Sequence, residues 1–231
     1  DNLVSERVVM TDEQQMQFLN IAKHRYYNEV YQILLSTGMR IGELTALQWD
    51  DIDFENKEIH IRHSMQSAYL NGKKILNMTT PKTSNSISDI PMFDGVEKLF
   101  VFWKEKQDKA KKELGRRWRL PKEFENLVFT SSLGSPLTRY VLSNDINKIV
   151  SILNKNEEYL AEQENRVPKK FPKLHPHSFR HTFATRCFEK NLKPVFIMSI
   201  MGHSNYETTL SYTHLLKKSN DQQVSLAGSF V

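Results

Sequence analysis

The spacing of the hydrophobic residues changes twice along the chain, and this change limits the folds that it can adopt. From Thr11 to Leu47 apolar residues recur at helical spacing, from Glu58 to Pro91 they alternate in short runs, and from Gly95 onward helical spacing returns. A chain with this order places a small group of strands inside a helical protein. The expected fold class is therefore mainly α with a small antiparallel β-sheet.

Capping residues mark the ends of the first helices. Thr11 and Gln14 have the spacing of a capping box, in which each side chain accepts a hydrogen bond from the other residue's backbone N–H, so a helix is expected to begin there. A second helix is expected over 26–35, and Gly38 can end it because glycine readily adopts the left-handed conformation of a helix C-terminus. A third, short helix over 41–47 follows directly.

Three strand-like runs come next, over 58–65, 74–80 and 86–91. Asn71-Gly72 favours a tight hairpin turn between the first two, and 81–85 is rich in turn-forming residues. Helices are then expected over 95–114, 138–153, 176–190, 194–201 and about 206–216. The polar segment 154–173, which contains two prolines, is expected to be an exposed excursion between them.

Composition narrows the class of protein. With 231 residues, 39% of them hydrophobic, the chain can bury a substantial core and does not have the composition of a disordered protein. No run approaches the roughly 18 apolar residues of a membrane helix, and residues 1–20 do not form a secretion signal. The single cysteine, Cys187, cannot form an internal disulfide, which is typical of cytoplasmic proteins. A net charge of +5 favours a polyanionic partner without specifying one.

The densest group of chemically active side chains is HSFRH, residues 177–181. On a helix, His177, Arg180 and His181 lie on one face, and their side chains suit the binding of an anion. Taken alone, the same pattern is also that of a polar flank on an amphipathic helix. A zinc site is not expected, because the histidine pair lacks both the glutamate of the metalloprotease helix motif and a third ligand at suitable spacing.

Two other segments carry groups of the same kind. In MGHS, residues 201–204, Gly202 can end one helix and leave His203 in the turn before the next. In TGMRIGE, residues 37–43, Arg40 and Glu43 lie around the start of a helix. Tyr212 follows in SYTHL, and an isolated tyrosine on a helix is usually a core or surface residue. None of these segments identifies a function alone.

Together, these segments resemble the catalytic domain of the tyrosine recombinases (phage integrases) over nearly the whole chain, from about Glu6 to Leu216. The matching motifs, in the order that the family uses, are TGMRIGEL with Arg40, TPKTSNS with Lys82, HSFRH, MGHS and SYTHL with Tyr212. Phe179 stands where the family usually has Leu. The resemblance implies six catalytic residues, with Tyr212 as the nucleophile: Arg40, Lys82, His177, Arg180, His203 and Tyr212. Glu43 and His181 are expected in supporting positions.

This set of residues suits the cleavage of a phosphodiester without a metal, ATP or other cofactor. Fixed cations such as Arg40 and Arg180 can bind the phosphate oxygens, on which negative charge grows in the transition state. Attack by Tyr212 gives a phosphotyrosine that conserves the energy of the broken bond. By resemblance, Lys82 is the general acid that protonates the leaving sugar oxygen.

The resemblance also implies an organisation and a set of partners. Residues 1–231 are expected to be a single catalytic domain, cut from a longer protein that carries an N-terminal core-binding domain. The expected partners are double-stranded DNA, further copies in a tetramer on paired DNA sites, and accessory DNA-bending or excision factors, with no membrane. The tail, 217–231, is expected to pack on a neighbouring copy. The expected location is the cytoplasm, in association with the nucleoid.

Several alternatives stay open from the sequence. An integrase of a mobile element is favoured over a Xer-type chromosome-resolution recombinase. A type IB topoisomerase shares this chemistry, but the compact HSFRH and MGHS motifs argue against it. An inactive DNA-binding relative is disfavoured by the intact catalytic set.

The spacing of His203 and Tyr212 raises a geometric problem. A straight helix from Ser204 to Tyr212 would separate its ends by roughly 12 Å, too far for both side chains to meet one phosphate. We therefore expect a break near Thr208-Thr209, a Tyr212 segment that docks only on DNA, or a tyrosine supplied by a neighbouring subunit.

Overall fold

The protein is mainly helical with a minor antiparallel component, which confirms the fold class expected from the hydrophobic pattern. The computed structural model describes residues 8–70, 72–79, 88–202, 207 and 209. Its helices are α1 (Asp12–Ala22), α2 (Asn28–Thr37), α3 (Ile41–Ala46), α4 (Asp94–Leu114), α5 (Arg139–Gln163), α6 (Pro176–Glu189) and α7 (Pro194–Met201). Its strands are β1 (Ile52–Asp53), β2 (Glu58–Ile61), β3 (Ser64–Leu70), β4 (Lys73–Thr79) and β5 (Ser88–Pro91). Short 3-10 turns lie at η1 (Trp49–Asp51), η3 (Gly115–Arg117) and η4 (Lys122–Phe124).

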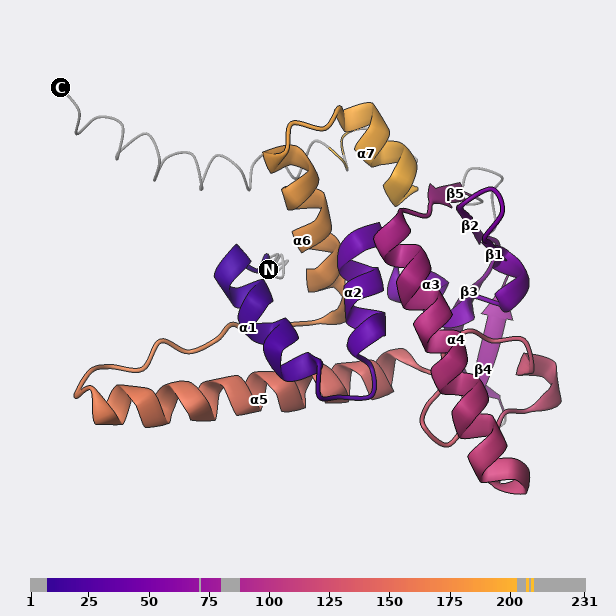
Figure 1. The fold of residues 1–231 in the computed structure, drawn as a ribbon, viewed down its shortest axis with the longest axis horizontal. Coiled ribbons are helices and arrows are strands. Elements are labelled where there is room, and N and C mark those ends of the chain that lie inside the picture. Colours follow the sequence, from indigo (N-terminus) through magenta and orange to yellow (C-terminus); the bar gives the residue numbers. More distant parts are fainter. Residues whose placement is uncertain (1–7, 71, 80–87, 203–206, 208, 210–231) are drawn as a thin grey trace.

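The helix α2 lies at the centre of the core, in contact with α1, α4 and α6 (Figure 1). Six of its ten residues are buried, among them Tyr31. Phe18 of α1 and Phe179 of α6 place their rings 5.1 and 5.5 Å from the ring of Tyr31. Phe179, where the family usually has Leu, therefore completes an aromatic cluster that joins three helices.

The helix starts and ends that the sequence predicted from local signals are confirmed. Thr11 and Gln14 form the expected capping box, with hydrogen bonds of 3.1 and 2.9 Å. Gly38 and Gly202 adopt left-handed conformations, with φ of 63° and 57°, and end α2 and α7. Pro176 is the first residue of α6, where its missing N–H costs no hydrogen bond.

The strands form two small sheets. In the first, β2 lies between β1 and β5, and Ile59 pairs with both Ile52 and Ile90. The second is the β3–β4 hairpin, which runs in register from Ser64↔Thr79 to Leu70↔Lys73. The single strand expected over 58–65 is thus wrong: the run divides at Arg62-His63, and its two halves belong to different sheets. The alternating pattern continues across this break, so it does not mark the point of division.

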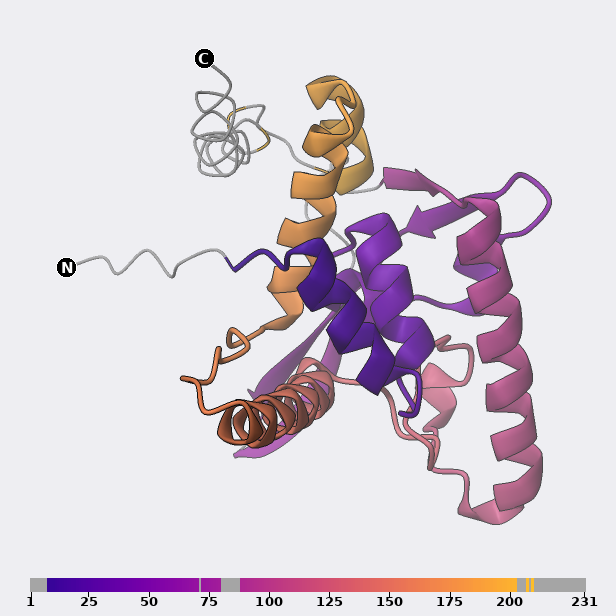
Figure 2. The same cartoon turned by 60° about the vertical axis from the view of Figure 1, so that its left-hand side comes forward.

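The helix α5 extends to Gln163, so the helix end expected at residue 153 is wrong. Figure 2 looks nearly along this helix, and in Figure 1 its distal half projects from the rest of the molecule, with the segment 164–175 running back beside it. Backbone N–H groups of Lys169 and Phe171 donate to Glu157 and Asn154 of the helix, both at 2.7 Å. These contacts stabilise a polar helical stretch that has no apolar periodicity of its own.

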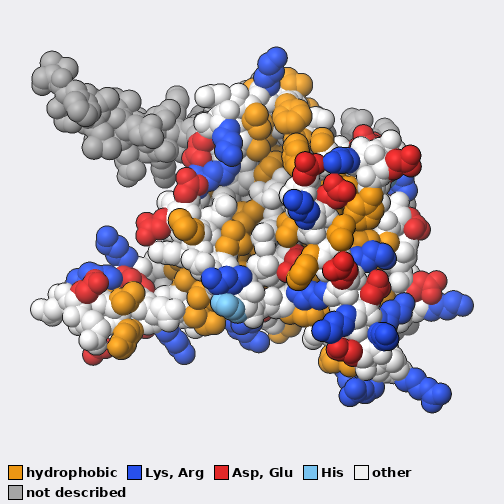
Figure 3. All heavy atoms as spheres, in the orientation of Figure 1, with side chains coloured by type: hydrophobic (Ala, Val, Ile, Leu, Met, Phe, Trp, Pro, Cys, Tyr) orange, Lys and Arg blue, Asp and Glu red, His pale blue; other side chains and the backbone are white. Residues whose placement is uncertain are grey.

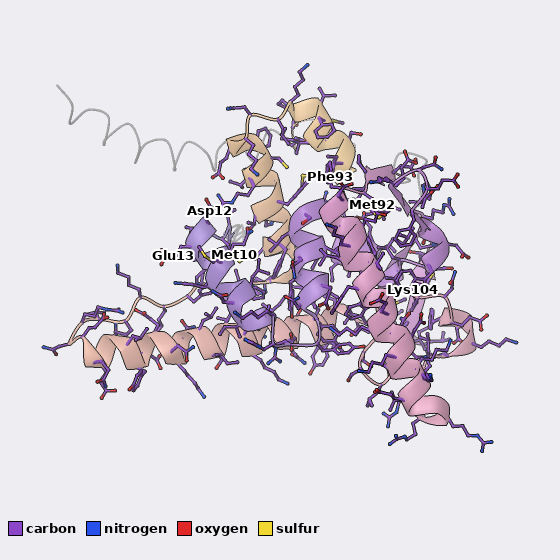
Figure 4. The ribbon with its side chains drawn as sticks, in the orientation of Figure 1. Met10, Asp12, Glu13, Met92, Phe93 and Lys104 are labelled. Carbon is purple, nitrogen blue, oxygen red and sulfur yellow. The ribbon has the colours of Figure 1, made fainter. Side chains whose placement is uncertain are left out.

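The segment before α1 is bound to α6. The backbone N–H of Met10 (labelled in Figure 4) donates to the Thr182 hydroxyl at 3.1 Å, and its carbonyl accepts from Arg186 at 2.9 Å. Basic side chains gather at the far end of α4, over its last turn and η3 (Figure 3). None of the helices described combines the length and the apolar composition that crossing a lipid bilayer requires.

Candidate active site

The junction between α2 and α3 presents Arg40. The left-handed Gly38 ends α2, and a Cβ at this position would lie 2.3 Å from the ring of Phe183 on α6, so only glycine allows this approach. Arg40 then precedes α3 in an extended conformation. The Glu43 carboxylate accepts from the Arg40 backbone N–H at 2.8 Å and from its Nη1 at 2.7 Å. Glu43 therefore fixes the direction of the Arg40 side chain, which stays 41% exposed.

Arg180 comes from α6 and is buried. Its Nη1 donates to the Gly38 carbonyl at 2.6 Å and its Nη2 to the Met201 carbonyl at 2.5 Å. Both acceptors lie at helix C-termini, where carbonyl groups lack partners within the helix and carry partial negative charge. The guanidinium of Arg180 therefore joins the ends of α2 and α7.

The two arginines meet at the end of α7. Arg40 donates from Nη2 to the carbonyl of Gly202 at 3.2 Å, next to the Met201 carbonyl that holds Arg180. Arg40 and Arg180, which belong to motifs far apart in the sequence, therefore donate to the carbonyls of two adjacent residues. The Arg40 side chain is 41% exposed, so it can also reach an anion in the space beside it.

His177 lies in the first turn of α6, beside the two arginines. Its pKa is held below the usual value of 6.5, first by burial and then by the charges of Arg139, Arg180 and Arg40, with Glu43 acting in the opposite direction. Its imidazole is therefore neutral at pH 7 and can accept a proton.

An open cavity of about 700 Å³ lies beside Arg40 and His177. Its walls come from α3, β3 and the first turns of α5 and α6. Most of the residues that line it are polar or basic, among them Arg40, Ser64, Gln66, Thr138, Arg139 and His177. No aspartate or glutamate is among the described residues that line it. A cavity of this kind favours an anionic ligand.

Sequence reasoning did not identify Arg139. It lies in SPLTRY, which contains no motif that points to a site. The available signal was Thr138, whose hydroxyl accepts from the Val141 N–H at 3.3 Å and caps α5. This cap fixes where α5 begins, but only the fold brings the helix start to the cavity.

The remaining predicted residues fall into two groups. His181 is half-buried on α6 and does not line the cavity. Lys82, His203 and Tyr212 lie outside the described residues, as do the tail 217–231 and the break expected near Thr208-Thr209, apart from Thr209 itself, which is buried. The catalytic roles assigned to all of these residues stay predictions.

Within the described ranges, one group of side chains has the geometry to hold a metal ion. It consists of Glu58, His60 and Asp89, on the sheet formed by β1, β2 and β5. None of the three lines the cavity. The Nδ1 atom of His60 lies 2.7 Å from the Asp89 carboxylate, so a hydrogen bond across the strands also accounts for this pair.

Comparison with known proteins gives consistent matches over the chain. Residues 9–219 match the phage integrase family. A XerC-like tyrosine recombinase from Caldanaerobacter subterraneus subsp. tengcongensis is 26% identical over 230 residues, which cover 97% of this chain and 54% of that protein. The transposase from transposon Tn916 of Enterococcus faecalis is 30% identical over 214 residues, covering 89% of this chain and 47% of that protein.

The similarity extends to three-dimensional structure. The integrase of transposon Tn1549, solved in complex with circular intermediate DNA, superposes with a TM-score of 0.73 at 29% identity, covering 92% of this chain and 64% of that one. The chain spans about half the length of the curated relatives it matches. The comparison therefore concerns one part of those proteins.

Proposed function

Because the chain belongs to the phage integrase family, we propose that it is a site-specific DNA recombinase that cuts and rejoins DNA through a bond to Tyr212. The observation that carries this proposal is the placement of Arg40 and Arg180 on adjacent carbonyls, with Arg40 lining a cavity whose described walls contain no acidic residue. Such preorganised cations stabilise a phosphate whose oxygens gain negative charge in the transition state. Both arginines are held in place before the substrate binds, so little reorganisation accompanies the reaction.

The cleavage step transfers the phosphate from DNA to protein. The Tyr212 oxygen attacks the phosphorus, a phosphorus–tyrosine bond forms, and the bond from phosphorus to the 5′-oxygen breaks. The DNA keeps a 3′-phosphotyrosyl link, and the 5′-oxygen leaves as a hydroxyl after it takes a proton from Lys82. Rejoining is the reverse step, in which a 5′-hydroxyl of another strand displaces Tyr212. The number of phosphoester bonds is unchanged, so ATP is not needed, and the arginines supply the charge that a metal supplies elsewhere.

The phenol of Tyr212 must lose a proton during attack, since its free pKa is near 10. His177 is suited to accept this proton because its imidazole is kept neutral by burial and by the surrounding arginines. His203 follows directly after Gly202, whose carbonyl holds Arg40. We assign His203 to a hydrogen bond with a phosphate oxygen, and Glu43 and His181 to supporting positions.

Integration or excision of a mobile element is the role that the relatives favour. The Tn916 transposase and the Tn1549 integrase belong to transposons by their names. A Xer-type role in chromosome resolution is the second candidate, because the XerC-like relative covers 97% of this chain. The two roles differ in substrate: the joined ends of an element in the first, and a chromosomal site in the second.

The proposed partners follow from the same role. Double-stranded DNA is the substrate, and the solved Tn1549 integrase is a complex with DNA. We further propose a tetramer on paired DNA sites in which the tail 217–231 packs on a neighbouring copy, with accessory DNA-bending or excision factors. The activity would take place in the cytoplasm, at the nucleoid.

A covalent-capture assay tests the proposal. The substrate is a nicked duplex that contains the joined ends of the element that encodes the protein, so that the cleaved strand diffuses away and traps the phosphotyrosine. We expect the wild type and Tyr159→Phe to form the adduct, because Tyr159 is 63% exposed on the distal part of α5. Tyr212→Phe should form none.

An adduct formed by Tyr212→Phe would refute the assignment of the nucleophile. Relaxation of supercoiled plasmid without any strand exchange would favour a topoisomerase. Cleavage of a chromosomal resolution site, but not of the element junction, would favour the Xer-type role.

A further inference from the structure

Arg139 is a cation of the cavity that no motif predicted. It is the first residue of α5, it is exposed, and it lines the cavity together with Arg40 and His177. In the part of the chain that the structure describes, no hydrogen bond or ion pair engages its guanidinium. Five other arginines have a carboxylate partner: Arg25, Arg40, Arg62, Arg166 and Arg186. Arg116, Arg117 and Arg119 have none among the described residues, but they lie at and beyond the end of α4 and do not line the cavity.

The position of Arg139 is unfavourable for helix stability. A helix N-terminus carries partial positive charge, so an acidic residue is favoured there and a basic one is not. The first turns of α1, α2, α3 and α4 each contain an acidic residue, whereas those of α5, α6 and α7 contain none. Two of these three helices, α5 and α6, begin at the cavity, as does α3, whose acidic Glu43 is bound to Arg40. A local conflict of this kind is expected where a residue serves a function.

The charge of Arg139 acts on His177, as do the charges of Arg40 and Arg180. After burial, it is the largest cause of the lowered pKa of His177, ahead of Arg180 and Arg40. Since no described acidic residue lines the cavity, this third positive charge has no counterion from its walls. DNA supplies one, because each nucleotide along a strand carries a phosphate.

We propose that Arg139 is a DNA-positioning residue that binds the backbone phosphate next to the one held by Arg40 and Arg180. This inference rests on the proposed recombinase function. Binding two successive phosphates fixes the register of the strand in the cavity, so the reacting phosphate lies where the catalytic groups converge. A guanidinium is suited to this contact because it can bind two phosphate oxygens at once.

The experiment compares three variants of the chain: Arg139→Gln, Arg139→Lys and Lys155→Gln. Lys155 is a matched control, because it is exposed on the same helix, roughly 24 Å further along at 1.5 Å per residue, and loses the same charge. Binding to a short duplex of random sequence is measured over a range of salt concentrations. Cleavage of the nicked substrate is measured in single turnover at saturating DNA.

For Arg139→Gln we expect the slope of log K against log[salt] to become shallower by about 0.9, the value for one lost phosphate contact. Arg139→Lys should keep the slope, since it keeps the charge, but should cleave more slowly than the wild type because a lysine cannot bind two oxygens in a fixed plane. Lys155→Gln should match the wild type in both measurements. None of the three should melt below the wild type, and Arg139→Gln should melt slightly above it because an unfavourable charge leaves the start of α5. This result separates loss of contact from loss of fold.

An unchanged slope for Arg139→Gln, or an equal loss of slope in Lys155→Gln, would overturn the assignment while the wild type still cleaves. Failure of the wild type to form the adduct would instead refute the recombinase proposal. In that case the salt slope still reports whether Arg139 contacts DNA.

Discussion

Arg180→Lys separates the two roles that the structure gives to Arg180. The substitution keeps the positive charge but replaces a planar group with a single nitrogen. In the protein, Nη1 and Nη2 of Arg180 reach carbonyl oxygens that belong to different helices, at Gly38 and Met201. One ammonium cannot take both positions, so at least one buried carbonyl loses its charged partner.

The expected magnitudes follow from these bonds. A hydrogen bond to a charged group contributes about 1.5–3 kcal/mol, so the free energy of unfolding should fall by about that amount. The effect on cleavage should be larger. Loss of one preorganised donor to the developing phosphate charge slows a reaction roughly 10²–10³-fold.

Urea unfolding and single-turnover cleavage measure the two effects separately. Arg186→Lys is the control, because Arg186 lies on the same helix and donates to the Met10 carbonyl at 2.9 Å, but is not bound beside Arg40 at the end of α7. It should lose stability and cleave at the wild-type rate. If Arg180→Lys cleaves as fast as Arg186→Lys, the assignment of Arg180 to the phosphate is wrong. If its stability is unchanged, the two carbonyl bonds do not stabilise the fold.

Three further substitutions follow from the structure. Gly38→Ala should lower the unfolding free energy by about 2–4 kcal/mol, because the new methyl group crowds Phe183 on α6 and alanine is strained in a left-handed conformation. Gly72 also has a positive φ, of 74°, but lies in open space. Gly72→Ala should therefore show only the cost of the left-handed conformation in the same urea titration. Lys106→Met should destabilise the protein by about 3 kcal/mol, because the buried carboxylate of Glu29 loses its charged partner at 2.8 Å and keeps a hydrogen bond from Asn28 at 3.2 Å. Glu29→Gln in the same chain should recover part of the loss. The pKa of His177 is lowered on folding, so the unfolded chain binds a proton below pH 6.5 that the folded chain does not. The wild type should therefore lose more stability than His177→Gln between about pH 7.5 and pH 5, and an equal loss in both would contradict the lowered pKa.

The parts of the fold that the sequence predicted are those governed by local chemistry. The capping box at Thr11, the left-handed stops at Gly38 and Gly202 and the start of α6 at Pro176 depend on residues within one turn of each other. Local signals of this kind need no knowledge of tertiary contacts. They also located Arg40 and His177, because both lie next to such a helix end.

The sequence predictions that were wrong or incomplete concern features that depend on contacts between distant segments. The pairing of β2 with β5 divides the run 58–65, and nothing near Arg62 in the sequence encodes a partner almost thirty residues away. The second half of α5 lacks apolar periodicity, and Glu157 stabilises it by binding Arg166 and the backbone of Lys169 in the returning segment. Arg139 was missed for the same reason, because its proposed role depends on which segments of the fold surround the first turn of α5.

The candidate site is built from helix ends, and this explains how it can hold several positive charges together. The C-termini of α2 and α7 direct carbonyl oxygens at Arg180 and Arg40, which partly neutralises each guanidinium on the side that faces the protein. The N-termini of α5 and α6 carry no acidic residue and face the cavity from the other side. The protein therefore stabilises these two cations through the backbone, while Arg139 faces the cavity without a described partner. Because no described aspartate or glutamate lines the cavity, an entering phosphate meets no carboxylate on these walls, and the positive field of the cavity is available as soon as DNA arrives.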